Sequence, residues 1–529
     1  MEEHDLSPYI SIQDLSYTLP DGRVLFKDIS ESFGGEFSAL AGRNGSGKTI
    51  LAKIMAGLIS PGSGRVIRSG TVCYLDQLVD PSEYSTVADL AGKEKILNSL
   101  HRITAGYPEE GDLEIADGNW DMEERLLREL DISGLGYLLP DLPATRLSGG
   151  ECTRISLIGA FLSGADFLIL DEPTNHLDQP NRKALIEYLG TWKGGLLVIS
   201  HDRAVLEVVE RIFELSSGGL DSYGGNLDVF LEARRLQRSA ALDNLERVKT
   251  ERKRAKAERS MLLERQQRRS SAGRRSAPDS GIPRIAMNAI RSMAKKTEGK
   301  TRSAAAEKVE VLAAEEKKAF LEARIEDTVV LIPPRCAVHA GKIVLRLDEV
   351  VLPFGSHGEP ISLTAAGPER IAVTGPNGSG KSTLLRVLMG ETRPLSGSCR
   401  IMVDYAYLDQ FTSVPLDISP IEHLCAADPG MEQGEAGTRL AQVGISREML
   451  RVKNRNLSGG ERLKVALLAA IHRVPVPQLL ILDEPTNHLD LDSVESVEKL
   501  LCAYTGALVV VSHDRRLLEN IAISRELEM

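Results

Sequence analysis

A nine-residue stretch, Leu-Asp-Glu-Pro-Thr-Asn-His-Leu-Asp, occurs twice in this chain, at residues 170–178 and 482–490. Each copy continues an apolar run, residues 167–170 in the first and 479–482 in the second, which predicts a buried parallel strand with acids at its carboxyl end. That edge is where an α/β sheet carries its chemistry. One carboxylate can hold a magnesium ion while the next orients and deprotonates a water molecule. The repeat therefore predicts an α/β chain with two similar sites.

A phosphate-binding loop stands ahead of each copy. In the first half, a strand-like run at residues 37–41 leads into the loop and a helical pattern at residues 50–58 follows it, which is the context that such a loop requires. Its glycines let backbone amides surround phosphate oxygens at a helix N-terminus, its lysine adds a positive charge, and its final hydroxyl can coordinate magnesium. The loop residues are Gly42, Asn44, Gly45, Ser46, Gly47, Lys48 and Thr49 in the first half and Gly375, Asn377, Gly378, Ser379, Gly380, Lys381 and Ser382 in the second.

Three further motifs recur in the same order in both halves. A glutamine, Gln77 or Gln410, stands 35 residues after the first glycine of its loop. A Ser-Gly-Gly-Glu motif follows, and a histidine comes after the apolar run beyond the acidic strand. These motifs are Ser148, Gly149, Gly150 and His201 in the first half and Ser458, Gly459, Gly460 and His513 in the second. A lone histidine is more often structural, but its place in this order indicates a role in the site.

The two halves differ in length at one place. From the glutamine to the leucine before the Ser-Gly-Gly motif there are 70 residues in the first half and 47 in the second. The first half therefore contains about 23 extra residues, within roughly residues 85–120, which we interpret as a projecting arm.

Length and composition restrict the class of protein. A single core stops growing at about 250–300 residues, so a chain of 529 residues should hold more than one domain. The six cysteines show no paired spacing, which argues against a disulfide framework or a zinc site and fits a reducing compartment. The first residues lack a signal-peptide pattern, and no apolar run approaches the length of a membrane span. We therefore expect a cytoplasmic protein without an integral membrane domain.

The net charge of −11 conceals a basic segment. Residues 231–310 contain 22 Lys and Arg against 10 Asp and Glu, a balance of +12 that leaves −23 for the rest of the chain. Residues 231–269 are predicted to be helical, a break is predicted at residues 270–283, and a second helical run extends to about residue 324. Basic residues crowd toward the break: Arg252, Lys253, Arg254, Lys256, Arg259, Arg265, Arg268, Arg269, Arg274 and Arg275.

A solvated hairpin without a partner would also explain this charge. The one-sided excess of basic residues instead favours a polyanionic partner, bound through its phosphates with a salt-dependent affinity. Few aromatic residues lie in the segment, so we expect contacts to the backbone and shape of RNA with little base stacking.

The ordered set of phosphate loop, glutamine, Ser-Gly-Gly motif, acidic strand and histidine resembles the ATP-binding cassette (ABC) ATPases over both halves of the chain. Two cassettes on one chain, both with Glu-Pro-Thr-Asn-His-Leu-Asp, and a charged helical linker between them resemble the ABC-F subfamily. The resemblance implies an α/β fold of two P-loop NTPase domains joined by a long α-helical hairpin. The expected boundaries are 1–230 for the first cassette, 231–325 for the linker and 326–529 for the second cassette.

The resemblance also implies residue roles. The cassettes would pair head to tail within one monomeric chain, with each ATP between the phosphate loop of one and the Ser-Gly-Gly motif of the other. Glu172 and Glu484 would act as general bases, and His201 and His513 would contact the γ-phosphate. Magnesium would be bound by Thr49, Gln77 and Asp171 in the first site and by Ser382, Gln410 and Asp483 in the second. Because neither site lacks an acid or a histidine, we expect both to hydrolyse ATP.

Adenine stacking is expected to differ between the sites. The family often places an aromatic residue on the base, and Phe354 suits this role in the second half. The comparable position in the first half falls on Leu19 or Pro20, with Tyr17 displaced. This difference leaves the nucleotide preference of the first site open.

ABC-F proteins act on ribosomes, so the resemblance implies ATP-dependent binding near the ribosomal exit site, with the linker touching ribosomal RNA and possibly transfer RNA. The sequence does not separate a general translation factor, which the predicted break of about 14 residues slightly favours, from an antibiotic-resistance protein. An alternative is the tandem ATPase subunit of an ABC importer, against which the basic linker speaks. A third possibility, a related DNA-repair ATPase, would need cysteines at zinc-binding spacing, which this sequence lacks.

Overall fold

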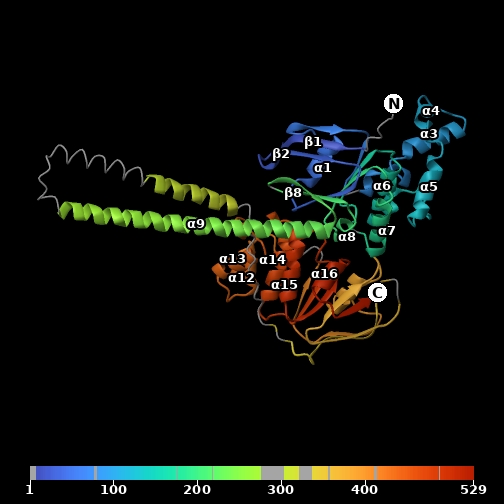
Figure 1. Cartoon of the computed structure of the whole chain (residues 1–529). Coiled ribbons are helices and arrows are strands. Elements are labelled where there is room, and N and C mark those ends of the chain that lie inside the picture. The colour runs from blue at the N-terminus through green and yellow to red at the C-terminus, as the bar shows by residue number, and fades with distance from the viewer. Residues whose placement is uncertain are drawn as a thin grey trace. The chain divides into compact units, whose positions relative to one another are not determined.

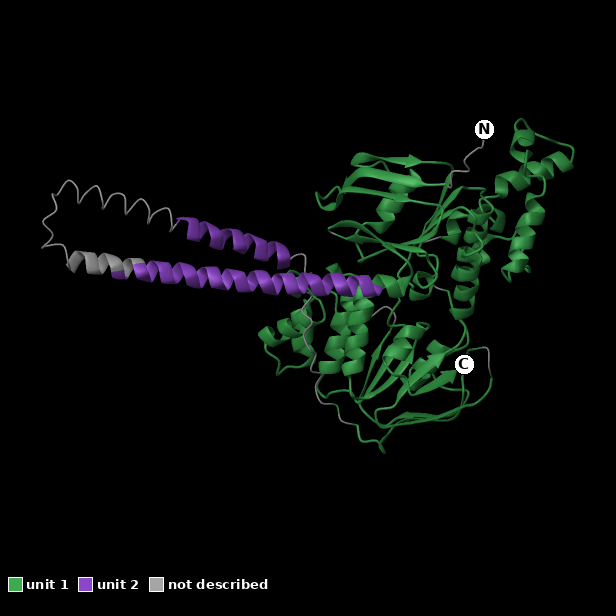
Figure 2. Ribbon diagram, in the orientation of Figure 1, with its two compact units in different colours: residues 1–230, 329–529 green, residues 231–328 purple. Residues whose placement is uncertain are grey.

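The structure is a computed structural model that describes residues 8–76, 80–175, 177–216, 218–275, 303–320, 336, 338–355, 358–409, 414–487 and 489–529. It divides into two compact units (Figure 2). The first unit is formed by Met1–Phe230 with Val329–Met529 and contains both halves of the duplication, here called the first and second cassettes. The second unit, Leu231–Thr328, is the linker.

Each cassette is built on a largely parallel sheet (Figure 1). In the first cassette the strand order is β5-β6-β7-β3-β8-β9, and only β9 runs antiparallel to its neighbour. These strands are β5 (Val72–Leu75), β6 (Phe167–Asp171), β7 (Gly195–Ile199), β3 (Phe37–Gly42), β8 (Arg211–Ser216) and β9 (Gly219–Gly224). In the second cassette the order is β14-β15-β16-β12-β17, all parallel. These strands are β14 (Tyr405–Leu408), β15 (Leu479–Asp483), β16 (Ala507–Val511), β12 (Arg370–Thr374) and β17 (Arg525–Glu528).

A three-stranded antiparallel sheet accompanies each parallel sheet. Its order is β2-β1-β4 in the first cassette and β11-β10-β13 in the second, so the middle strand is the first of each cassette. The strands are β1 (Ile10–Thr18), β2 (Val24–Phe33), β4 (Ser63–Arg68), β10 (Ile343–Val351), β11 (Ile361–Ala366) and β13 (Ser396–Ile401).

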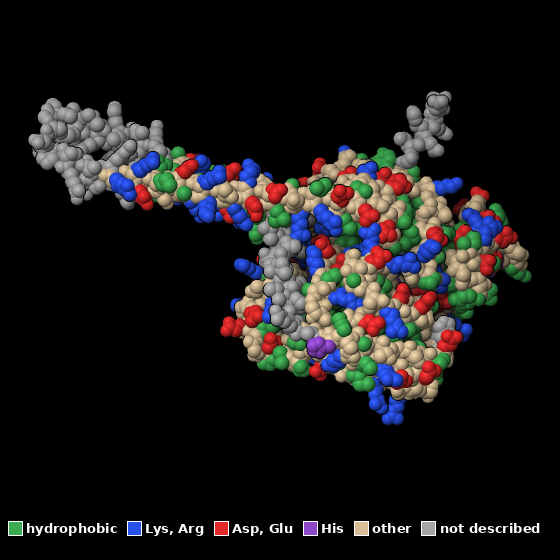
Figure 3. Space-filling view, turned by 60° about the horizontal axis from the view of Figure 1, so that its bottom comes forward, with side chains coloured by type: hydrophobic (Ala, Val, Ile, Leu, Met, Phe, Trp, Pro, Cys, Tyr) green, Lys and Arg blue, Asp and Glu red, His purple; other side chains and the backbone are tan. Residues whose placement is uncertain are grey.

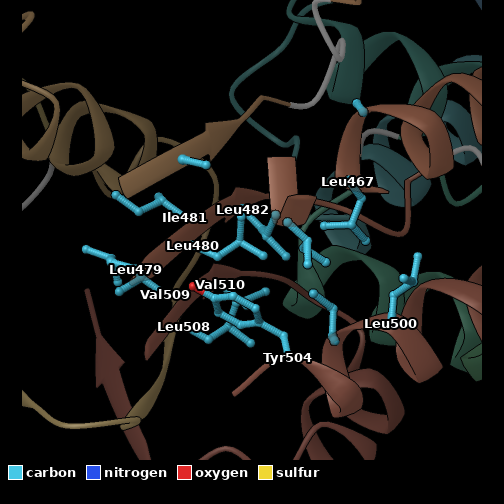
Figure 4. Close-up of a cluster of buried hydrophobic side chains, with 14 of the residues drawn as sticks. Leu467, Leu479, Leu480, Ile481, Leu482, Leu500, Tyr504, Leu508, Val509 and Val510 are labelled. Carbon is cyan, nitrogen blue, oxygen red and sulfur yellow. The ribbon is translucent and has the colours of Figure 1, made fainter. Parts of the chain in front are cut away.

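The two acidic strands are buried as their apolar sequences require. The first four residues of β15, Leu479–Leu482, are at most 1% exposed, and they pair in register with β16, for example Leu480 with Leu508. A parallel sheet with both faces covered needs such continuous apolar strands. Figure 4 shows these side chains around the ring of Tyr504, whose hydroxyl donates to the carbonyl of Pro477 at 2.7 Å. The core thus fixes where each acidic strand ends.

Helices complete the two cassettes in parallel fashion. One helix follows each phosphate loop, α1 (Lys48–Ala56) and α11 (Lys381–Leu388), and one follows each Ser-Gly-Gly serine, α6 (Gly149–Phe161) and α14 (Gly459–His472). Beyond the acidic strands come α7 (Gln179–Leu189) and α15 (Leu491–Ala503), and beyond the histidines α8 (Arg203–Leu206) and α16 (Arg515–Asn520). The remaining helices and turns of the second cassette are α12 (Pro420–Ala427), α13 (Gln433–Gln442), η3 (Met449–Arg451) and η4 (Asn454–Asn456).

The first cassette carries more helices before its Ser-Gly-Gly motif. They are η1 (Pro81–Glu83), α2 (Val87–Leu90), α3 (Glu94–Thr104), α4 (Asp112–Ala116), α5 (Met122–Ile132) and η2 (Ala144–Arg146). Figure 1 shows α3, α4 and α5 grouped at one end of the cassette. The Arg102 guanidinium on α3 binds the Asp112 carboxylate at the start of α4, with Nε at 2.8 Å, which ties this span together.

The linker consists of two paired helices in its described part. The first is α9 (Leu227–Arg275), and the second spans residues 303–320. Leu245 packs on Ala319, while Ala255 packs on Val309 and Leu312, so the two helices run in opposite directions. Arg252 bonds Glu316 at 2.8 Å across the pair. The predicted α/β fold of two cassettes with a helical linker is confirmed.

The predicted break within the linker is partly wrong. Helix α9 continues without interruption through residues 270–273 to Arg275. A single glycine costs a helix only about 1 kcal/mol, and the first proline, Pro278, comes five residues after Gly273, so Ser270–Gly273 did not suffice to end it. Residues 276–302, with the rest of the predicted break and the start of the second run, lie outside the described residues.

In the described chain, no helix combines the length and the apolar character that a bilayer crossing demands.

Candidate functional site

Both phosphate loops have the strand-loop-helix geometry that their sequence predicts. Lys48 opens α1 and its ammonium donates to the backbone carbonyls of Gly42 at 2.8 Å and Arg43 at 3.0 Å. Lys381 opens α11 and repeats the arrangement with Gly375 at 2.7 Å and with the next carbonyl at 2.8 Å. Each lysine therefore lies curled inside its own loop, a position from which it can reach phosphate oxygens.

The first glycine of each loop is fixed by the sheet. Gly42 has φ 144°, and a Cβ there would lie 2.3 Å from the carbonyl oxygen of Leu215 on the neighbouring strand. Gly375 has φ 142°, and a Cβ would lie 2.4 Å from the carbonyl oxygen of Met529. Because neither backbone neighbour can move aside cheaply, only glycine fits at the start of the loop.

The two cassettes meet at their phosphate loops. The backbone amide of Asn44 in the first cassette donates to Asp490 Oδ2 of the second at 3.0 Å. The backbone amide of Asn377 in the second cassette donates to Asp178 Oδ2 of the first at 2.9 Å. Each aspartate is the last residue of the repeated nine and the N-cap of the following helix, α7 or α15. One side chain therefore closes its own helix and holds the phosphate loop of the other cassette.

These shared contacts affect the charge of the two aspartates. Burial acts to raise the pKa of both carboxylates, but the hydrogen bonds that they accept outweigh it. Asn377 and Asn181 hold the pKa of Asp178 below its ordinary value, while Ser493 and Asn44 do the same for Asp490. The lowered pKa favours the anionic form of both side chains, which accept hydrogen bonds from the start of their own helix and from the phosphate loop of the other cassette.

The glutamates that directly follow Asp171 and Asp483 have an unusual backbone conformation. Glu172 has φ 46° and Glu484 has φ 47°, in the left-handed region that a glutamate rarely adopts. The amide of Glu172 donates to the carbonyl of Ile199 at 2.8 Å, and the amide of Glu484 donates to the carbonyl of Val511 at 2.9 Å. Hydrogen bonds to the next strand thus hold a conformation that costs about 1–3 kcal/mol, which marks both glutamates as functional candidates.

Each glutamate faces the histidine of its own cassette. Glu172 Oε1 lies 3.7 Å from His201 Nε2, and Glu484 Oε1 lies 3.4 Å from His513 Nε2. Burial raises the pKa of Glu484 to about 7 and lowers that of His513 to about 4. It shifts the pKa values of Glu172 and His201 in the same directions. Burial thus makes both glutamates stronger bases than exposed carboxylates and favours the neutral form of both histidines.

The oxygen donors at each site suit magnesium. The Thr49 hydroxyl bonds the Asp171 carboxylate, whose Oδ1 is buried without a hydrogen-bond partner in the described chain. In the second cassette Ser382 bonds Asp483, and Asp409 has a similarly unpaired Oδ1. No set of three His, Cys, Asp or Glu side chains gathers for a metal among the described residues. A hydroxyl and one carboxylate leave room for water and phosphate ligands, as Mg²⁺ prefers.

The glutamate that follows each Ser-Gly-Gly motif has a structural role, because it closes a capping box with the serine. Ser148 caps α6: its amide and hydroxyl donate to Glu151 Oε2 at 2.7 and 2.6 Å, and its oxygen accepts from the Glu151 amide. Ser458 and Glu461 form the same capping box on α14. A glutamate three residues after the cap closes this box as well as a glutamine does. The box fixes the serine at the start of a helix whose amides can bind a phosphate.

The two sites open into one cavity of about 1720 Å³. Of the predicted residues, those that line it are Asn44, Gly45, Gly47, Lys48, Thr49, Asp171, Glu172, His201, Phe354, Asn377, Gly378, Gly380, Lys381, Ser382, Gly459, Asp483, Glu484 and His513. Those that do not line it are Gly42, Ser46, Ser148, Gly149, Gly150, Gly375, Ser379, Ser458 and Gly460. The second Ser-Gly-Gly motif therefore reaches the cavity only at Gly459, and the first does not reach it.

Two further predictions concern the edges of the sites. Gln77 and Gln410 lie outside the described residues. Phe354 is 73% exposed on the cavity wall, a position open to a stacked base, whereas Leu19 and Arg23 line the wall on the first side.

Sequence reasoning missed the contacts that join the cassettes. Asp178 and Asp490 stand in the repeated stretch but were not singled out, although an aspartate directly before a helical pattern is a capping signal. No local pattern marks Arg203, which forms an ion pair with Glu498 on α15 of the other cassette.

Comparison with known proteins agrees with this geometry. The family model described as "ABC transporter" matches residues 27–175 and 359–487. The chain is similar to "Tylosin resistance ATP-binding protein TlrC" of Streptomyces fradiae, with 32% identity over 94% of this chain and 93% of that protein. It is also similar to "ATP-binding cassette sub-family F member 3" of Mus musculus, with 30% identity over 97% of this chain and 70% of that protein.

A third relative is "Ribosome protection protein VmlR" of Bacillus subtilis (strain 168), with 28% identity over 98% of this chain and 86% of that protein. Among solved structures, archaeal aABCE1 in "Crystal structure of the complex of archaeal ribosomal stalk protein aP1 and archaeal ribosome recycling factor aABCE1" has a TM-score of 0.59 at 17% identity, covering 97% of this chain and 87% of that one. This likeness concerns the fold.

Proposed function

This chain belongs to the ABC transporter family, within its ABC-F subfamily, and we propose that it hydrolyses ATP at two composite sites between its cassettes and binds the ribosome when ATP is present. In this proposal the protein acts in the cytoplasm as a single chain. Its linker contacts ribosomal RNA, and transfer RNA where it is bound, near the exit site.

One observation carries the proposal of composite sites. Asp490 holds the phosphate loop of the first cassette through Asn44, and Asp178 holds that of the second through Asn377. Each loop is thereby completed by the other cassette. ATP bound to either loop would change both cassettes, and it can favour a closed pair only by binding that state more tightly than an open one.

The side chains within each site support hydrolysis. Lys48 and Lys381 would bind phosphates, and Glu172 and Glu484, with pKa values raised by burial, would take a proton from the attacking water. The neutral His201 and His513 can donate a hydrogen bond to a phosphate oxygen. Catalysis would come mainly from positioning and charge stabilisation, as in other phosphoryl transfers.

Magnesium would be held by the hydroxyl and carboxylate of Thr49 and Asp171, and of Ser382 and Asp483. Bound there, the ion would neutralise negative charge on the phosphates. The Ser-Gly-Gly motif of each cassette would clamp the γ-phosphate bound to the other cassette. Of the two motifs only Gly459 lines the cavity in this structure, so clamping requires both motifs to move closer to the cavity.

The linker supports a ribosomal partner. Lys253, Arg254, Lys256 and Arg265 are exposed on α9, and Figure 3 shows Lys and Arg side chains along its described part. Such a surface attracts phosphate groups. Two relatives are named for tylosin resistance and for ribosome protection, which favours protection of the ribosome from an antibiotic over a housekeeping role.

Ribosome co-sedimentation tests the proposal. The Glu172→Gln, Glu484→Gln double variant should pellet with ribosomes in ATP, with binding that falls as salt rises. Changing Lys253, Arg254 and Lys256 together to Gln should release it. A control that changes the exposed Lys27, Lys453 and Lys499 to Gln should still bind. A double variant that stays in the supernatant at low salt would contradict ribosome binding.

Resistance is tested separately. Expression in a susceptible host should raise the inhibitory concentration of tylosin, and the Glu172→Gln, Glu484→Gln variant should abolish that increase. An unchanged inhibitory concentration together with ATP-dependent ribosome binding would favour a general translation role.

A further inference from the structure

The contacts that join the two cassettes are unequal on the two sides of the interface. Arg203 and Arg515 occupy the same place, each two residues after the histidine of its site. Arg203 forms an ion pair between its Nη1 and Glu498 Oε1 on α15 of the second cassette. Arg515 reaches across in the opposite direction to Gln179 on α7; with the amide oxygen facing the guanidinium, this oxygen accepts a hydrogen bond from Arg515 Nε at 2.6 Å. At these two equivalent positions, Arg203 is thus joined to an opposite charge and Arg515 to a neutral amide.

The charged contact is also the better buried one. The side chains of Arg203 and Glu498 are 12% and 9% exposed, whereas Arg515 is an exposed residue. An ion pair withdrawn from water is screened little by salt, and removing one partner leaves the other as an uncompensated buried charge. The Arg203–Glu498 pair should therefore resist opening more than the Arg515–Gln179 contact.

Further buried charges surround this pair without obeying the symmetry of the duplication. Asp514 Oδ2 lies 3.8 Å from Arg203 Nη1, and Arg182 forms an ion pair with Asp202, with Nε 2.9 Å from Oδ2. The position of Arg182 is taken by Val494 in the second cassette, and that of Glu498 by Ile186 in the first. The first cassette therefore supplies both arginines of this cluster.

The geometry links Arg203 to the first site by two routes. Through the chain, Arg203 directly follows the His201-Asp202 pair, and His201 faces Glu172. Through the ion pair, it holds α15, whose N-cap Asp490 bonds the amide of Asn44 in the first phosphate loop. On the other side, the equivalent contact of Arg515 is to the neutral Gln179, and a charged side chain from the first cassette, Arg182, acts on His513.

We infer that Arg203 is a positioning residue of the first composite site, where its bond to Glu498 keeps His201 and Asp490 in place together and makes the two sites open at unequal rates. The inference rests on the proposed ATP hydrolysis at composite sites and adds the order in which the two sites open. The first site holds its nucleotide longer, and the second opens first.

Single-site backgrounds test this inference. Glu484→Gln leaves turnover to the first site, and Glu172→Gln leaves it to the second. In the first background Arg203→Gln should lower kcat about tenfold while KM for ATP changes by less than about threefold, because Arg203 positions groups without touching the nucleotide. In the second background Arg515→Gln should lower kcat by less than about threefold, since a neutral contact is lost. Equal effects of the two substitutions would overturn the inference.

Rescue separates positioning from general damage. Combining Glu498→Gln with Arg203→Gln removes the orphaned carboxylate and should restore part of the lost kcat, so the two effects are not additive. Additive losses would overturn the proposed link. The control Arg516→Gln removes another arginine that crosses the interface to Glu207, at a half-exposed position, and should change kcat by less than about twofold.

Folding is checked with a second variant. If Arg203→Gln does not fold, Arg203→Lys keeps a buried charge but loses the planar fork of the guanidinium and should lower kcat of the first site with KM nearly unchanged. An Arg203→Lys protein with wild-type kcat would overturn the inference. Backgrounds that show no turnover before Arg203 is changed would instead contradict ATP hydrolysis at composite sites.

Discussion

The carboxylate of Asp490 accepts a hydrogen bond from the backbone amide of Asn44 at 3.0 Å, although 446 residues separate them in the sequence. The same carboxylate caps α15. Two functions therefore depend on one side chain, the start of a helix in one cassette and the phosphate loop in the other.

Asp490→Ala should weaken both functions. Losing an N-cap costs about 0.5–2 kcal/mol, and the unpaired amide of Asn44 should reduce turnover beyond that loss of stability. Turnover and urea denaturation should be measured together. Thr86→Ala removes the cap of α2 away from both phosphate loops, so it should affect stability alone. If both variants lower turnover equally, the contact across the interface has no role in it.

The two glutamates should each contribute to turnover. Glu172→Gln and Glu484→Gln remove one proposed general base each, so either alone should leave part of the rate, and both together should lower it by at least about 100-fold. Steady-state phosphate release measures this. Glu495→Gln, which changes an exposed glutamate paired with Lys499, is the control. A single substitution that leaves the rate untouched would show that its site is silent.

The capping boxes make a prediction about the Ser-Gly-Gly motif. Glu461→Gln keeps the box and should retain turnover within about twofold, whereas Glu461→Ala opens it and should lower turnover by about fivefold, the equivalent of a 1 kcal/mol cap. Glu422 closes an identical box on α12, so Glu422→Ala provides a matched control that affects stability without affecting turnover.

The strand that carries Asp483 should be sensitive to cavities. Leu480 is 0% exposed in β15, and Leu480→Ala should lower the free energy of unfolding by about 2–5 kcal/mol. Leu395 is 70% exposed, and its replacement by Ala should change the free energy of unfolding by less than about 0.5 kcal/mol. Denaturant titration distinguishes the two, and a similar small loss in both would contradict the packing around β15.

Stability should fall at acid pH partly through Asp178. Its pKa is held below the ordinary aspartate value of about 3.9 by the amides that it accepts, despite its burial. A group with a lowered pKa contributes stability above the unfolded-state pKa and loses it as pH falls through the folded-state value. Between about pH 5 and pH 2, wild-type protein should therefore lose more stability than Asp178→Asn. Urea denaturation over this range tests it, and parallel curves would show that the carboxylate adds nothing.

Local sequence predicted the elements that carry the sites. The apolar run before Asp171 and the glycines before Lys48 each have one stable interpretation, because a buried parallel strand and a phosphate loop impose strict residue requirements. The predicted roles of these residues remain predictions, and those of Gln77 and Gln410 concern positions outside the described residues.

What could not be predicted depends on distant parts of the chain. Glu172 adopts a left-handed backbone against its own preference, because the carbonyl of Ile199 holds its amide. The Arg203–Glu498 pair exists only when two cassettes are packed together. The break expected at residues 270–273 was wrong because one glycine costs a helix only about 1 kcal/mol, which a long helical run can tolerate.

The left-handed backbone at Glu172 and Glu484 also limits which replacements are informative. A β-branched residue such as Thr or Val would meet steric strain there in addition to losing the carboxylate. A loss of activity in such a variant therefore could not be assigned to the missing carboxylate alone. Gln is unbranched at Cβ and has the size of Glu, so it adds no new backbone strain. The same constraint means that natural variation at these two positions should be confined to Glu, Gln, Asp, Asn and Gly, a bias that reflects the turn as much as the reaction.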